Sequence, residues 1–141
     1  MEELIEKLHT GGYSCVIEKE GKIRTFTRRG VADLYDLYEN EKAFMQGARI
    51  ADKVIGKGAA ALIALGKMKE VYTDVISTSA LSVLREAGIP IRYAEETPFI
   101  INRNKTDRCP LETVCKDLNT PEEMYPAIKA FVAQLRNKNH I

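Results

Sequence analysis

The sequence predicts an α/β protein, a three-layer α/β/α sandwich around a mixed sheet, and three observations support this fold class. Two alternating runs meet at Glu20-Gly21, which is typical of an antiparallel β-hairpin. The β-branched run "EVYTDVIS", residues 70–77, is typical of a strand covered on both faces. A helical pattern follows that run directly. A hairpin that leads into strand–helix units predicts a mixed sheet with helices on both faces.

The first half of the chain predicts a helix, the hairpin and a second helix. Residues 1–9 carry apolar side chains at helical spacing, and Gly11-Gly12 ends that segment. The hairpin strands are expected over residues 13–19 and 22–28. A short helix or turn follows, with four apolar or aromatic residues on one face, namely Val31, Leu34, Tyr35 and Tyr38.

The second half predicts a long central helix over about residues 52–65, the strand 70–77 and a further helix. Ser77 or Thr78 is expected to cap that further helix, which Gly88 and Pro90 end. The run "IPIRYAEETPFI" predicts a fourth strand, with a fifth possible after Pro98. The last helix follows a capping sequence with a first-turn proline, and Pro126 is expected to distort its first turn. The capping residues are Thr120, Pro121 and Glu123.

Length and charge limit the classes of function. The 141 residues are expected to form one domain, 1–141, with a core over about 13–135. The formal net charge of +1 disfavours nucleic acid as a partner. No apolar run approaches a membrane span, and the start "MEELIEKLHT" is acidic, so a cytoplasmic protein without a membrane partner is expected. Three cysteines fit a reducing compartment.

Three quoted segments resemble a known family: "GARIADKVIGKGAAALIALGK", "VYTDVISTSALSVLREAGIPIRYAEETPFIINR" and "CPLE". The chain resembles the family called domain of unknown function 1893 over about residues 13–135. The resemblance implies a cytidine-deaminase-like fold. It also implies one of the branches that keep this fold without the zinc machinery, alongside AICAR transformylase and the formate dehydrogenase accessory protein.

The residues themselves also argue against deaminase chemistry. A zinc deaminase needs a His or Cys ligand with a Glu at one helix start and Pro-Cys-x-x-Cys at the next. This chain has Asp52 and Lys53 at the first position and "STSALS", residues 77–82, at the second. Its two histidines, His9 and His140, lie near the termini. We therefore expect no metal and no cofactor.

The stretch "ADKVIGKGAAAL", residues 51–62, predicts a binding site for a small anionic, nucleotide-like ligand. As the start of the central helix it would hold Asp52 as cap and Lys53 and Lys57 one turn apart. Its glycines, Gly56 and Gly58, would together cost about 2 kcal/mol in a helix interior. Asp52 would accept hydrogen bonds from a base, a sugar or an amine, and the lysines would neutralise phosphate. Close packing against the sheet remains the alternative explanation.

Further candidates are expected to line the same crevice. Ser77 and Thr78 lie at a strand-to-helix turn, where capping explains them equally well. Asn102 and Arg103 follow a strand, and Cys109 precedes a helix start that would lower the pKa of its thiol. Possible catalytic residues are Asp52, Lys53 and Cys109, although it stays open whether the protein is an enzyme. The alternatives are a thiol-dependent carrier or accessory protein acting through Cys109 and a structural homodimer without a ligand, and a homo-oligomer is expected.

Overall fold

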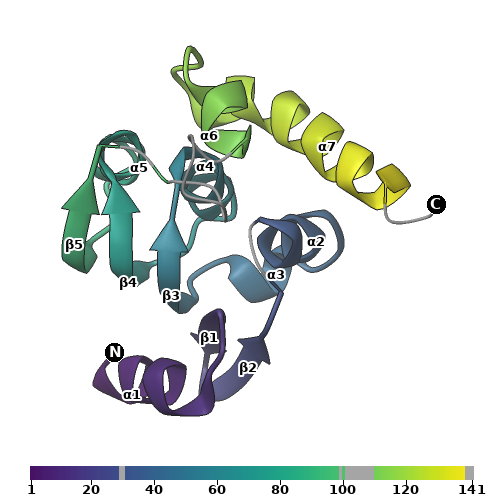
Figure 1. Ribbon diagram of the computed structural model, residues 1–141. Helices are drawn as coiled ribbons and strands as arrows, with labels where there is room; N and C mark the ends of the chain where they lie inside the picture. The colour runs from purple at the N-terminus through teal and green to yellow at the C-terminus, as the bar shows by residue number, and fades with distance from the viewer. Residues whose placement is uncertain (29–30, 99, 101–109, 139–141) are drawn as a thin grey trace.

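A computed structural model describes residues 1–28, 31–98, 100 and 110–138 (Figure 1). Helices and strands alternate along most of the chain after the N-terminal hairpin. The elements in chain order are α1 (Glu2–Gly11), β1 (Cys15–Lys19), β2 (Lys22–Phe26), α2 (Ala32–Asn40), α3 (Lys42–Met45), β3 (Arg49–Ile55), α4 (Lys57–Leu65), β4 (Glu70–Ser77), α5 (Thr78–Glu86), β5 (Ile91–Thr97), α6 (Pro110–Cys115) and α7 (Pro121–Lys138).

The strands form one mixed sheet in the order β2-β1-β3-β4-β5. β1 is antiparallel to both β2 and β3, whereas β3, β4 and β5 run parallel. The predicted hairpin is confirmed. Its turn residues, Glu20 and Gly21, have φ of 51° and 85°, the paired positive angles that let a two-residue turn match the twist of its strands. The antiparallel pairs of β1 and the parallel pairs of β3, β4 and β5 confirm the mixed sheet.

Helices cover both faces of the sheet, which confirms the three layers. On one face, Leu4 and Leu8 of α1 pack with Val16, Ala51 and Tyr72 of the strands. On the other face lies the larger core, to which α2, α4, α5 and α7 contribute. Its largest fully buried side chains are Ile17, Met45, Ile50, Ile55, Leu62, Ile63, Ile76, Leu84, Met124 and Ile128.

The predicted central helix over residues 52–65 is wrong in its first third. Arg49–Ile55 is the strand β3, and the helix α4 starts only at Lys57, with Gly56 at the cap position. β3 pairs with β1 on one side and β4 on the other, so neighbours far away in sequence satisfy its backbone groups. Asp52 is consequently a strand residue rather than a helix cap, and Lys53 and Lys57 do not share a helix.

The remaining boundaries follow the prediction closely. Ser77 caps α5, because its Oγ accepts a hydrogen bond from the backbone N of Ala80 at 3.2 Å. Thr120 caps α7, since the backbone N of Glu123 donates to its Oγ1 at 3.1 Å. The possible strand after Pro98 falls mostly on residues outside the described part of the chain. None of the described helices is long and apolar enough to cross a bilayer.

Candidate functional site

The residues predicted to form one site lie in three different elements. Asp52 and Lys53 belong to β3, Lys57 opens α4, and Ser77 and Thr78 lie at the β4–α5 junction. Asn102, Arg103 and Cys109 lie outside the described residues. Asp52, Lys53 and Lys57 therefore do not share one helix start, contrary to the prediction from the sequence.

Lys57 holds two helices together. Its side chain is buried, and its Nζ donates to the carbonyl oxygens of Lys116, at 3.2 Å, and Leu118. These carbonyls directly follow α6, where helical backbone oxygens lack partners of their own. The ammonium group thus serves the end of α6, and a phosphate ligand would have to compete with these contacts.

Gly58 is explained by packing. A Cβ atom at this position would lie 2.6 Å from Cδ2 and 2.9 Å from Cγ of Leu111 in α6. Contacts that short require a neighbour to move. The absent side chain therefore lets α6 lie against the first turn of α4, and the unusual glycine does not by itself indicate a ligand.

The hydroxyl groups at the start of α5 also have structural partners. Ser77 is fully buried and caps the helix. Thr78 Oγ1 donates to Oε2 of Glu96 at 2.9 Å and to the carbonyl oxygen of Thr97 at 3.3 Å, which ties α5 to β5. Capping and strand tethering account for both side chains.

Lys53 and Asp52 face opposite sides of the sheet. Strand alternation places Asp52 on the same face as Ile50, which lies in the larger core, and directs the neighbouring Lys53 away from it. Lys53 is exposed, and its backbone N donates to the carbonyl oxygen of Ser14 at 3.1 Å. A single small ligand cannot contact both side chains through a central strand.

Asp52 is the predicted residue with the most unusual environment. It is half-buried and lies between Cys15 of β1 and Thr73 of β4. The pKa of its carboxyl group is raised to about 7, chiefly because burial disfavours the charged form. Hydrogen bonds from the backbone, including one from the N of Val54 at 3.3 Å, oppose the rise without cancelling it. This carboxyl group changes charge near neutral pH.

Asp33, in the first turn of α2, lies close enough to Asp52 for its charge to raise the pKa of that carboxyl. Oδ1 of Asp33 accepts a hydrogen bond from Nε of Arg28 at 2.6 Å. Oδ2 of Asp33 is buried and has no hydrogen-bond partner among the described residues. A buried acceptor without a donor is costly, so this oxygen is the unsatisfied position of the region. We call Asp33 and Asp52 the aspartate pair.

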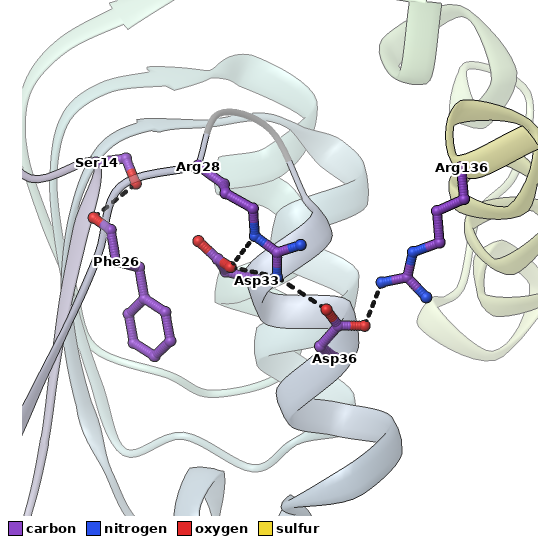
Figure 2. A network of polar contacts seen from close by, with 6 residues as sticks. All are labelled: Ser14, Phe26, Arg28, Asp33, Asp36 and Arg136. Atoms are coloured by element: carbon purple, nitrogen blue, oxygen red, sulfur yellow. Dashed lines mark hydrogen bonds and ion pairs between the residues drawn. The ribbon is translucent and has the colours of Figure 1, made fainter. Parts of the chain in front are cut away.

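Two arginines contact the carboxyl groups of Asp33 and Asp36 (Figure 2). Arg28 bridges Asp33 to Asp36, donating from Nη2 to Oδ2 of Asp36 at 2.8 Å. Arg136 of α7 donates to the other oxygen of Asp36. The network joins the end of the hairpin, α2 and α7, and no described residue donates to the second oxygen of Asp33.

Cys15, which the sequence did not single out, contributes a thiol beside the aspartate pair. Burial raises the pKa of this thiol well above its usual value, and the charges of Asp52 and Asp33 raise it further. A thiol in this state is protonated and a poor nucleophile. No sequence signal joined Cys15, Asp33 and Asp52, because only the β1–β3 pairing and the packing of α2 bring them together.

Metal ligands and a cavity are two other features that could mark a binding site. Among the described residues, no group of three His, Cys, Asp or Glu side chains is arranged to hold a metal ion. A cavity of about 430 Å³ lies at the opposite end of β3. It is lined by Glu18, Lys19, Glu20, Gln46, Gly47, Arg49 and Lys69, none of which belongs to the predicted site.

Comparison with known proteins identifies the family. The chain is similar to a crystal structure of a DUF1893 family protein from Thermotoga maritima, with a TM-score of 0.83 and 22% identity over 92% of this chain and 87% of that chain. Its similarity to RibD from Acinetobacter baumannii is slight, with a TM-score of 0.44 and 18% identity over 66% of this chain and 33% of that chain. No curated protein matches. The family model for the domain of unknown function DUF1893 matches residues 3–132, and the chain belongs to this family.

Proposed function

We propose that this protein binds a small nucleotide-like molecule at the aspartate pair, and that hydrogen-bond donors of the molecule contact the two carboxyl groups. The observation that carries the proposal is the unsatisfied, buried Oδ2 of Asp33 beside a carboxyl group that titrates near neutral pH. A bound amino, imino or hydroxyl group would supply the donor that the described residues do not provide.

The sign of the charge at the pair argues for donors rather than a phosphate at this point. Two carboxyl groups repel an anion. Of the two lysines that were expected to neutralise a phosphate, Lys53 points away from Asp52, and Lys57 donates to carbonyl oxygens at the end of α6. A nucleobase fits the pair because its exocyclic amino groups donate to carboxylates. An anionic part of the ligand would depend on Asn102 and Arg103, which stay predictions from the sequence.

Asp52 would also be able to exchange a proton with the bound molecule. A group whose pKa lies near the working pH can serve as either acid or base. Binding therefore has to be measured at two pH values before any reaction is sought.

A thermal-shift screen tests the proposal. Free bases, nucleosides and nucleotides are added to the wild-type protein and to Asp52→Asn and Asp33→Asn, at about pH 6 and about pH 8, and a ligand is scored by a concentration-dependent rise in Tm. Asp117→Asn serves as the matched control, because the Asp117 side chain is exposed and makes no hydrogen bond or ion pair with any described residue.

We expect bases or nucleosides to raise the Tm of wild type and of Asp117→Asn, and the Asp52→Asn and Asp33→Asn variants to lose at least about ten-fold in affinity. A ligand that binds both aspartate variants as tightly as wild type would contradict the proposal. Binding of inorganic phosphate alone, with no response to bases or nucleosides, would contradict it as well.

A further inference from the structure

The edge of the sheet at β5 is open. β4 is the only strand that pairs with β5 among the described residues, and Figure 1 shows β5 at the end of the sheet with no strand beyond it. Over residues 91–96, the N–H and C=O groups that point away from β4 pair with no other strand in the described part of the chain. Proteins usually protect such edges, because an unpaired strand recruits other chains.

The charges of β5 are sorted along the strand. Arg92 lies near its beginning, Ala94 lies at its centre, and Glu95 and Glu96 lie near its end. All four residues are exposed. If a second copy of β5 lies antiparallel to the first, each arginine meets the acidic end of the other strand, and two-fold symmetry makes this contact twice. A parallel arrangement would instead bring like charges together.

The present partners of these charges do not prevent such pairing. Glu96 accepts from Oγ1 of Thr78 through Oε2, and a carboxylate can accept further hydrogen bonds through its other oxygen. Arg92 donates to Oε1 of Glu2 at 2.5 Å, but the Glu2 side chain is 82% exposed, so this ion pair contributes little to stability. The side chain of Glu95 makes no hydrogen bond or ion pair with a described residue, and the small Ala94 allows close approach at the centre. Exchange of one exposed partner for another costs little, and an interface would shield the new pairs from water.

We infer that two copies of this chain associate through antiparallel pairing of their β5 strands, which joins the two sheets into one. The inference does not depend on the proposed ligand, because β5 and the aspartate pair lie on different parts of the sheet. The partner is a second copy of the chain, because the two ends of β5 carry opposite charges that complement each other when two such strands lie antiparallel.

Charge reversal tests this pairing. Molar mass is measured by light scattering after size exclusion, over a range of protein concentrations. The proteins are wild type, Arg92→Glu, the double variant that combines Glu95→Arg with Glu96→Arg, and the triple variant that combines all three substitutions. Lys22→Glu, an exposed residue on the other edge strand β2, is the control. Far-UV circular dichroism and melting curves verify that each variant is folded.

Wild type and Lys22→Glu should be dimers. Arg92→Glu and the double variant should each raise the dimer Kd at least about ten-fold, because symmetry turns two attractive contacts into two repulsive ones. The triple variant should restore dimers, since the opposite charges face each other again. A wild type that is monomeric at every concentration would overturn the inference. The inference would also be overturned if Arg92→Glu and the double variant dimerised as tightly as wild type, or if the triple variant stayed monomeric.

Discussion

Replacing the buried Lys57 by methionine separates a structural lysine from a ligand-binding lysine. Methionine keeps an unbranched side chain of similar length and removes the ammonium group that donates to the carbonyl oxygens of Lys116 and Leu118. A hydrogen bond to a charged group contributes about 1.5–3 kcal/mol. We therefore expect Lys57→Met to lower the free energy of unfolding by about 1.5–3 kcal/mol in the absence of any ligand.

For a chain of this size, that loss corresponds to a fall in Tm of about 3–12 °C. Urea denaturation followed by far-UV circular dichroism gives the free energy, and the slope m should stay unchanged because the fold persists. The matched control is Lys53→Met, on an exposed lysine, which should change stability by no more than about 0.5 kcal/mol.

An unchanged stability would contradict the structural role of Lys57. If Lys57 faced a ligand site as a surface charge, the ligand-free variant would be as stable as wild type or slightly more stable. A Lys57→Met variant that unfolds at the same urea concentration as Lys53→Met would show that the contact with the end of α6 does not support the fold.

Three further predictions concern packing, pH and capping. Gly58→Ala should destabilise the protein by about 1–3 kcal/mol in urea unfolding, because the new Cβ would lie 2.6 Å from Leu111. Truncation of Leu111 in the same chain should make the glycine substitution harmless. A Gly58→Ala variant more stable than wild type would contradict this contact. The folded protein holds a proton on Asp52 up to about pH 7, whereas the unfolded chain releases it near pH 4. The stability of wild type should therefore fall as pH rises between those values, and Asp52→Asn should flatten that fall. Equal pH dependence of the two proteins in urea titrations would contradict the raised pKa. Thr120→Ala should cost about 1 kcal/mol in thermal unfolding through loss of the hydrogen bond from the backbone N of Glu123, and an unchanged Tm would show that the cap contributes nothing.

Local signals account for the parts of the fold that were predicted. The hairpin follows from two alternating runs around a turn that takes positive φ, and α5 and α7 follow from their caps at Ser77 and Thr120. Each of these signals acts over a few residues, so the sequence alone carries it. The prediction of one helix through residues 51–62 was wrong, because this stretch contains the end of β3 and the start of α4 with only Gly56 between them.

The candidate site was predictable only in part. Asp52 was singled out as a helix cap, but its unusual environment comes from its position between Cys15 and Thr73 in a buried sheet. Asp33 escaped notice because an acidic residue in the first turn of a helix is ordinary. Lys57 was assigned to phosphate because a sequence does not show which carbonyl groups lie within reach of an ammonium group.

The α/β class, the mixed sheet and the order of most elements could be predicted from the sequence, because periodicity, turns and caps depend on neighbouring residues. Membership of the DUF1893 family was predicted from the resemblance of three segments, and the match of the family model confirms it. Tertiary contacts were needed to make residues 49–55 a central strand, to bring Leu111 against Gly58, and to let the charge of Asp33 act on the pKa of Asp52. The physical reason is the same in all three cases. Strand pairing, steric contact and the desolvation of a carboxyl group depend on atoms brought together from distant parts of the chain, and no local pattern specifies them.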